Sequence, residues 1–455
     1  MNALAAVHSQ RGQPGKARVL YEEVLAGFRE LQLTDHPDAQ SAAMNLAILD
    51  AEKGDYDAAE SKMLGVVDNL RARLGPRHPQ TLKAMRNLAT TYSNRGDYAR
   101  AEALSKQVVE GFRALPEFGP DHPLTLTLLN NLAERYLQQR QYDQAQPLFE
   151  EILKARRANL EPGHPDTLTT MNNLAVVYQE QGFLEKADPL FQEALNAAMV
   201  KPGPDHPLTL KIKNCLATLR NQQGRIEEAE KLFNEVLQAR RKSLPADHPD
   251  LLISVHNLGV HYRLCKEYAK AESLLVEAAE RARATLTIRH PYTQKWMNSL
   301  AVLYGVQGRP ELAEPLFREL AEYQRTSAGP ESASYARCLE PLAQNLMHQG
   351  RYSDAEPLVR ECLAVRRQTE PDSWTTFYTQ ALYGSALARQ QKWADAEPAL
   401  LQGYEGMKQR AAQIPPEARI RLTKVAEWLV RLYESWGKPD EAARWRNELE
   451  SQNKL

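Results

Sequence analysis

The sequence predicts an all-α fold, a superhelical solenoid of about eleven antiparallel helix pairs, and three observations support this. The dipeptide His-Pro recurs seven times, at steps of 42 residues with one step of 44. An alanine recurs at a constant place in every repeat, eleven times in all. Apolar residues recur around it with the i, i+1, i+4 spacing of one helix face. A period of this length is typical of solenoids, in which each repeat packs only against its neighbours. The histidines of the dipeptide are His36, His78, His122, His164, His206, His248 and His290.

The recurring alanine, here called the anchor, aligns the repeats, which we number as copies from the amino terminus. Thirteen residues before the anchor lies a leucine in ten copies, twelve before it a small residue in nearly all, and nine before it often a tyrosine. We expect these positions to form the buried face of a first helix. The anchors are Ala17, Ala59, Ala101, Ala145, Ala187, Ala229, Ala271, Ala313, Ala355, Ala396 and Ala442.

His-Pro and a glycine are expected to bound the first helix of each copy. Proline suits the first helical position because its missing N–H is not needed there. The histidine before it is expected either to cap the turn or to pack on the previous copy. A glycine lies five residues before the anchor in eight copies, and it ends the helix because a positive φ costs glycine little. These glycines are Gly12, Gly54, Gly96, Gly182, Gly224, Gly308, Gly350 and Gly437.

The second helix carries the anchor. A small alanine there lets the two helices approach closely, and an apolar residue four positions later, such as Phe191, fills the space one turn on. Arginines near the end of this helix, such as Arg156 and Arg240, complement the negative end of the helix dipole. In five copies a proline follows two residues after the anchor, at Pro147, Pro189, Pro315, Pro357 and Pro398. Because proline inside a helix costs about 3 kcal/mol, the second helix either starts late in these copies or is bent.

The segment from His164 to Tyr178, followed by Gly182 and by Ala187 through Phe191, resembles a tetratricopeptide repeat. More narrowly, it resembles the 42-residue variety of kinesin light chains, over essentially the whole chain. The last stretch, from Ala396 onward, resembles the repeat tails of certain bacterial serine/threonine kinases. The His-Arg-Asp signature of a kinase is absent, so kinase activity is not expected. We expect a repeat array over residues 1–406 and an irregular copy over residues 407–455 that acts as a cap.

Composition and motifs favour a protein that is not an enzyme and needs no cofactor. The net charge is −1, from 57 basic and 58 acidic residues, so no bulk attraction to nucleic acid or membranes is expected. Four cysteines without metal-type spacing predict reduced thiols and a cytoplasmic location. Stacked copies lie about 10 Å apart, so their histidines cannot converge on one metal ion. No phosphate loop, zinc-protease helix, nucleophile elbow, signal peptide or membrane span is recognised.

One polar stripe is the candidate binding site. Fourteen residues before the anchor, five copies carry asparagine, on a side of the helix turned away from the buried leucine and tyrosine. An amide offers both a donor and an acceptor, which suits the backbone of an extended peptide. The family resemblance implies the same role for such a ladder; the alternative is that each amide bonds a neighbouring copy. The predicted peptide-binding residues are Asn45, Asn87, Asn131, Asn173 and Asn257. Lys83, Lys211 and Lys295 are predicted to join them, because each lies four residues, about one helix turn, before the asparagine position of its copy.

We therefore predict a scaffold or adaptor that binds a peptide or protein partner in the concave groove of the repeat superhelix. Two alternatives stay open: a regulatory repeat tail of a bacterial serine/threonine kinase system, and a sensor that closes around a small molecule or short peptide. The lysines favour an acidic partner. No metal, nucleic acid or membrane partner is expected, and the oligomeric state is not predicted.

Overall fold

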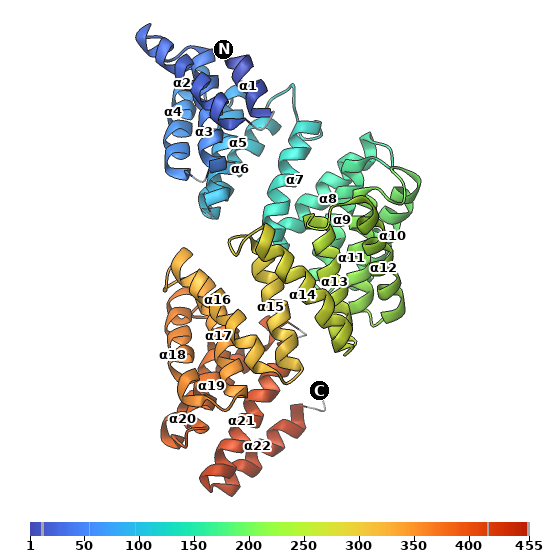
Figure 1. Cartoon of the computed structure of the whole chain (residues 1–455), viewed down its shortest axis with the longest axis vertical. Coiled ribbons are helices and arrows are strands. Elements are labelled where there is room, and N and C mark those ends of the chain that lie inside the picture. Colours follow the sequence, from blue (N-terminus) through green and yellow to red (C-terminus); the bar gives the residue numbers. More distant parts are fainter. Residues whose placement is uncertain (11–12, 54, 96, 416–417, 453–455) are drawn as a thin grey trace. The chain divides into compact units, whose positions relative to one another are not determined.

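The computed structural model of the chain describes residues 1–10, 13–53, 55–95, 97–415 and 418–452. Within these residues it contains 22 α-helices, one short 3-10 helix and no strand, which confirms the predicted all-α fold (Figure 1). In each copy the odd-numbered helix is the predicted first helix and the next, even-numbered helix carries the anchor alanine. Consecutive helices pack against one another within each of the two units described next.

The chain divides into two compact units, Met1–Arg225 and Ile226–Leu455. The first contains α1 (Asn2–Gln10), α2 (Pro14–Glu30), α3 (Pro37–Lys53), α4 (Tyr56–Leu74), α5 (Pro79–Arg95), α6 (Tyr98–Arg113), α7 (Pro123–Gln138), α8 (Tyr142–Asn159), α9 (Pro165–Glu180), α10 (Leu184–Val200) and α11 (Pro207–Gln222). The second contains α12 (Ile226–Ser243), α13 (Pro249–Leu264), α14 (Tyr268–Thr285), α15 (Pro291–Val306), α16 (Pro310–Ser327), α17 (Ala333–His348), α18 (Tyr352–Thr369), α19 (Trp374–Ala388), α20 (Trp393–Gln409), η1 (Ala411–Gln413), α21 (Ile420–Trp436) and α22 (Pro439–Gln452). The boundary falls between the two helices of the sixth copy.

Each histidine of the His-Pro dipeptide caps the helix that follows it, as one of the two expectations held. In all seven, Nδ1 accepts the backbone N–H two residues later, at 3.1 to 3.2 Å. His164, for example, accepts from the N–H of Asp166. An accepting Nδ1 carries no proton, so the imidazole proton lies on Nε2. The dipeptide therefore supplies a cap and a first helical residue in one motif.

The position five residues before the anchor is left-handed whichever residue occupies it. The glycines there have φ from 71° to 83°, at Gly182, Gly224, Gly308, Gly350 and Gly437. Where glycine is missing, the backbone still has positive φ: 59° at Arg140, 63° at Lys266 and 62° at Gln391. The expected role of this position is confirmed for these copies, while Gly12, Gly54 and Gly96 lie outside the described residues.

The core forms around the anchors and the leucines of the first helices. Each anchor alanine is at most 1% exposed, and from the second copy on each leucine thirteen residues before it is at most 5% exposed. The alternative of a late start for the second helix is wrong, because all five prolines lie inside their helices. In α8, for example, the helix begins at Tyr142, five residues before Pro147.

Neighbouring copies are joined by a repeated polar contact, here called the inter-copy pair. It links the residue nine positions before one anchor with the residue that directly follows the preceding anchor. The tyrosine hydroxyls donate to glutamate Oε1: Tyr136 to Glu102 at 3.0 Å, Tyr262 to Glu230 at 2.8 Å and Tyr433 to Glu397 at 2.8 Å. Each pair fixes a first helix to the second helix of the copy before it.

Two copies replace the tyrosine–glutamate contact with an ion pair at the same positions. Arg220 donates through Nη1 and Nη2 to Asp188, at 2.5 and 2.9 Å. In the second copy the charges are reversed, because Asp50 stands on the first helix and accepts from Arg18 on the preceding second helix. The pairing thus recurs at these positions while its chemistry changes. It is not present in every copy, because Tyr178 bonds Glu150 instead, and Leu346 and Leu387 stand at the same position in later copies.

Arginines near the ends of three second helices are buried and bond the next first helix, a role that the dipole argument did not predict. Arg156 Nη1 donates to the carbonyl of Asp166 at 2.8 Å and to Thr170 Oγ1 at 2.6 Å. Arg240 and Arg366 repeat this pattern with the equivalent carbonyl and hydroxyl oxygens. These arginines therefore tie one copy to the next.

Replacing Asp188 with Asn should destabilise the protein at neutral pH and less so in acid. The hydrogen bond from Arg220 lowers the pKa of Asp188, against the opposing effect of burial. A lowered carboxylate pKa contributes stability above the unfolded value of about 4, and this is lost as pH falls through the folded-state pKa. We expect a loss of roughly 3 kcal/mol at pH 7, because the buried Arg220 loses the charge of the Asp188 carboxylate.

Urea unfolding followed by circular dichroism at several pH values measures this effect. The difference between wild type and Asp188→Asn should shrink as the pH falls below about 4. Asp205→Asn, which removes an exposed loop carboxylate, serves as the control and should change little. An equal loss for Asp188→Asn at pH 7 and at low pH would contradict the assignment.

Candidate functional site

The first helices share one face, here called the ladder face, formed by the positions 18, 14, 11 and 7 residues before each anchor. This spacing brings the four side chains onto one side of a helix. In the third copy they are Lys83, Asn87, Thr90 and Asn94, and in the fourth Thr127, Asn131, Glu134 and Gln138. All eight are exposed or half-buried. The predicted asparagines and lysines occupy two of the four positions.

Asn173 forms a hydrogen bond to a neighbouring copy. This agrees with the alternative expectation, in which each amide bonds a neighbouring copy and not a ligand. Its side chain is only 5% exposed, and its Nδ2 donates to Glu134 Oε1 at 2.8 Å. Glu134 belongs to the preceding copy and also accepts from Asn130 Nδ2 at 3.0 Å. Asn173 therefore uses one of its two N–H donors within the protein, and its Oδ1 accepts from Asn172 Nδ2 at 3.4 Å.

The other predicted residues are more accessible. Asn131 is exposed, and Asn45, Asn87 and Asn257 are half-buried. Asn45 bonds the Tyr21 hydroxyl, and Asn257 Oδ1 lies 3.2 Å from His256 Nδ1. Lys83, Lys211 and Lys295 are exposed, and none forms an ion pair within the described residues.

The structure brings Asn87 and Asn131 together at one cavity in the first unit, here called the amide cavity. It has a volume of about 290 Å³ and lies between α5, α6 and α7. Its lining consists of Arg86, Asn87, Thr90, Ser105, Val108, Val109, Leu128, Asn131 and Arg135. Two amides, two hydroxyls and two guanidinium groups thus face a space large enough for a ligand side chain.

Arg135 gives the amide cavity an unsatisfied donor. Its Nη1 is buried and has no hydrogen-bond partner among the described residues, and its Nε donates only a long bond of 3.4 Å to the carbonyl of Asn131. Burial lowers the pKa of the Arg135 guanidinium. Arg86 likewise has no ion pair in the described part of the chain. A buried donor without a partner is costly, so an oxygen of a bound ligand would be stabilising here.

Arg86 and Arg135 do not belong to the asparagine and lysine pattern of the repeats, so that pattern did not predict them. Arg135 lies ten residues before its anchor, where other copies carry apolar residues such as Val177, Leu219 and Leu303. Thr91, His261 and Asn345 show that polar residues also occur at this position, but most copies are apolar there, so a charged arginine was the signal that could have identified it.

A second cavity, here called the cationic cavity, lies in the second unit between α17, α19 and α21. It has a volume of about 280 Å³. Its lining consists of Gln344, Met347, His348, Tyr352, Tyr378, Leu382, Ser385, Arg389, Lys424, Glu427, Trp428 and Arg431. Nine of these residues occupy ladder-face positions in the last three copies. The asparagine pattern does not predict this cavity, because Leu382 and Trp428 stand at the asparagine position of their copies.

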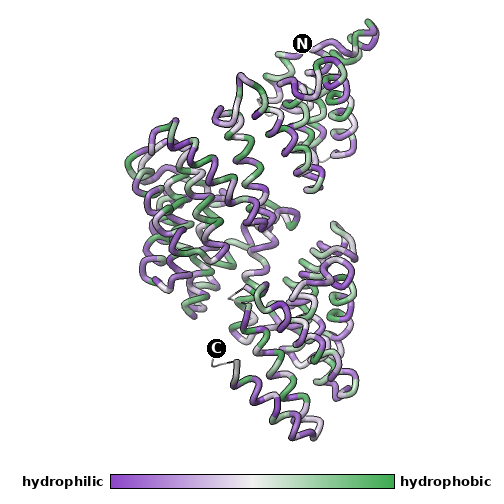
Figure 2. The backbone as a smooth tube through the Cα atoms, turned by 180° about the vertical axis from the view of Figure 1, so that it is seen from behind, coloured by the Kyte–Doolittle hydropathy of each residue, from purple (hydrophilic) through white to green (hydrophobic). Residues whose placement is uncertain are grey.

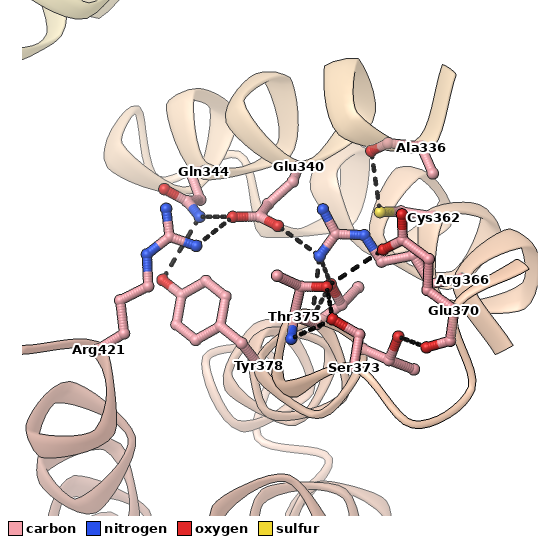
Figure 3. Close-up of polar contacts among 12 residues, drawn as sticks. Ala336, Glu340, Gln344, Cys362, Arg366, Glu370, Ser373, Thr375, Tyr378 and Arg421 are labelled. Atoms are coloured by element: carbon pink, nitrogen blue, oxygen red, sulfur yellow. Dashed lines mark hydrogen bonds and ion pairs between the residues drawn. The ribbon is translucent and has the colours of Figure 1, made fainter. Parts of the chain in front are cut away.

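A buried ionic network lies beside the cationic cavity (Figure 3). Glu340 on α17 is 6% exposed and accepts from Arg366 at 2.7 Å and from Arg421 at 2.9 Å. The Arg421 guanidinium also lies 4.6 Å from the centre of the Tyr378 ring. Arg421 thereby links α21 to α17, two copies away, and this contact fixes the position of α21 at the cavity.

Comparison with protein families identifies the repeats. The family model described as "Tetratricopeptide repeat" matches residues 1–63, 38–114, 166–242, 208–284, 250–326 and 292–368, and a second model of the same description matches residues 125–166. These matches cover well over half of the chain, so the chain belongs to the tetratricopeptide repeat family. A comparison with curated proteins gives no match.

Solved structures similar to this chain include several repeat proteins. The quorum sensor NprR from B. thuringiensis, in its apo form, is 15% identical, with 80% of this chain and 96% of that chain covered and a TM-score of 0.52. Aspartyl phosphate phosphatase F from Bacillus subtilis is 14% identical, with 83% and 95% covered and a TM-score of 0.50. Kinesin light chain repeats from Podosopora anserina are 25% identical, with 46% and 98% covered and a TM-score of 0.42. The first two likenesses support the fold.

Polar and apolar segments alternate along the helices of both units (Figure 2). Among the described residues, no helix combines the length and the apolar character that crossing a membrane requires. The alternation is what helices need when one side packs on neighbours and another faces water.

Replacing Glu340 with Gln should be strongly destabilising, because Arg366 and Arg421 would lose their shared countercharge. Removing one partner of a buried ion pair costs about 3–5 kcal/mol. Arg421→Gln should cost less, since the Arg421 side chain is 35% exposed while that of Arg366 is 5% exposed. Thermal and urea unfolding test this order, with Glu331→Gln on an exposed loop as the control. A smaller loss for Glu340→Gln than for Arg421→Gln would show that the network is not the main restraint.

Proposed function

We propose that the chain is a non-catalytic scaffold or adaptor that binds an extended segment of a protein partner along the ladder face of the first unit. The observation that carries the proposal is the amide cavity, where two ladder asparagines lie beside an arginine with an unsatisfied donor. Belonging to the tetratricopeptide repeat family supports a role in protein interaction. We also propose a cytoplasmic location and a capping role for residues 407–455.

The amides suit the backbone of the partner. Asn87 and Asn131 come from adjacent copies and line the same cavity, so each has room to donate to a peptide carbonyl and to accept from a peptide N–H. Asn173 differs, because Glu134 already accepts from it. The proposed ladder in the first unit therefore runs through Asn45, Asn87 and Asn131.

The cations suit acidic side chains of the partner. Arg86 and Arg135 line the amide cavity without an ion pair in the described residues, and Lys83 stands one helix turn before Asn87. A carboxylate in the amide cavity would form charge-assisted hydrogen bonds with the accessible guanidinium N–H groups of Arg86 and Arg135. The preferred partner is thus an extended segment that carries aspartate or glutamate.

Selection from a displayed library of random twelve-residue peptides, followed by fluorescence anisotropy with the selected peptides, tests this function. The double variant Asn87→Ala, Asn131→Ala should bind roughly tenfold more weakly or worse, since each hydrogen bond contributes about 0.5–1.5 kcal/mol. Its melting temperature should stay nearly unchanged, because Asn131 is exposed and Asn87 half-buried. Arg135→Met should also reduce binding.

Asn173→Ala is the matched control. It should lower the melting temperature and leave peptide affinity nearly intact, because the Asn173 amide bonds Glu134. The selected peptides should be rich in aspartate and glutamate, and their affinity should fall as salt is added. Normal binding by the Asn87→Ala, Asn131→Ala variant would contradict the proposal and place the partner elsewhere.

A further inference from the structure

The cationic cavity of the second unit gathers positive charges that have no counterion. Arg389, Lys424 and Arg431 line it, and none of them forms an ion pair within the described residues. The nearby Arg421 differs from these three residues, because it forms an ion pair with Glu340 at 2.9 Å. One carboxylate, Glu427, lies on the same lining, so three cations face one acid. In a protein of net charge −1, this is a local excess of positive charge at a hollow surface.

The floor of the cationic cavity is apolar and aromatic. Leu382 and Tyr378 are buried there, and Trp428 is half-buried. The rings of Tyr378 and Trp428 lie 6.0 Å apart between centroids and are inclined by 33°. Aromatic faces of this kind favour contact with flat or apolar groups. The cavity volume of about 280 Å³ lies near the lower limit of small-molecule sites, about 300 Å³.

The floor is held by contacts of Arg421, whereas two of the cations are exposed. The bond from Arg421 to Glu340 and the stacking of Arg421 over Tyr378 hold α21 against the preceding copies. Arg389 and Arg431, in contrast, are exposed. The guanidinium of Arg389 lies 5.7 Å from the centre of the Tyr352 ring. A preorganised apolar floor with a cationic rim is complementary to a ligand that carries both an apolar body and an anionic end.

We propose that the cationic cavity binds a small organic anion. Its flat or apolar part lies on Trp428 and Tyr378, and its carboxylate or phosphate group faces Arg389, Lys424 and Arg431. The residues that form this site all belong to the second unit, whereas the proposed peptide-binding ladder lies in the first. The two sites are therefore chemically different and can be tested separately.

Calorimetric titration of the full chain with matched probes tests the proposal. Naphthoate and naphthyl phosphate carry the same flat group with a carboxylate or a phosphate, naphthalene methanol lacks the charge, and inorganic phosphate lacks the ring. At least one aromatic anion should bind with one-to-one stoichiometry, about tenfold or more tightly than either control probe. The better of the two anions identifies the anionic group that the site prefers. Equal binding of naphthalene methanol, or no binding of either anion, would overturn the proposal.

Variants assign the binding to this cavity. The double variant Arg389→Gln, Arg431→Gln and the single variant Trp428→Leu should each weaken the aromatic anion by about tenfold or more. Arg337→Gln is the matched control, because it removes an exposed cation of α17 that is not part of the lining. Asn87→Ala with Asn131→Ala should leave probe binding unchanged, which separates this site from the peptide site. Unchanged affinity in the folded double arginine variant would place the anion elsewhere and overturn the proposal.

Discussion

The contact between the residue nine positions before one anchor and the residue after the preceding anchor is the constraint on which the rest of the structure depends. In several copies it joins the first helix to the second helix of the copy before it, as in Tyr136 with Glu102. At the same two positions, other copies carry an ion pair. In one copy Arg220 on the first helix bonds Asp188, and in another the charges are exchanged, with Asp50 on the first helix and Arg18 on the preceding second helix. A repeat protein gains stability from such nearest-neighbour interfaces, so this contact determines how one copy is oriented on the next.

This arrangement divides the faces of each first helix between stability and binding. Leucine packs in the core, tyrosine or its substitute reaches the preceding copy, and the ladder face stays open for a ligand. Binding capacity then depends on where polar side chains on or next to that face lack partners. Arg135 has an unsatisfied donor in the first unit, and Arg389 and Arg431 have no countercharge among the described residues of the second. Asn173 shows the opposite case, since its amide is used between copies.

The sequence predicts the features that repeat and misses those that depend on a particular neighbour. The 42-residue period, the helix-capping role of His164 and the left-handed turn at Gly182 follow from local backbone chemistry, which is the same in each copy. Whether Asn173 is available depends on Glu134 in another copy, and a single-copy pattern contains no such information. The cationic cavity could not be predicted for a related reason. Trp428 stands at the asparagine position of its copy, so the asparagine pattern does not extend to the residues that line this cavity.

A double-mutant cycle on Tyr136 and Glu102 tests the central claim most directly. The unfolding free energies of Tyr136→Phe, of Glu102→Ala and of the double variant give the coupling energy between the two residues. Our account predicts a favourable coupling of about 1 kcal/mol for this adjacent pair, and no coupling between Tyr136 and Glu60, which lies two copies away. Additive effects of Tyr136→Phe and Glu102→Ala would contradict the claim that this contact joins neighbouring copies.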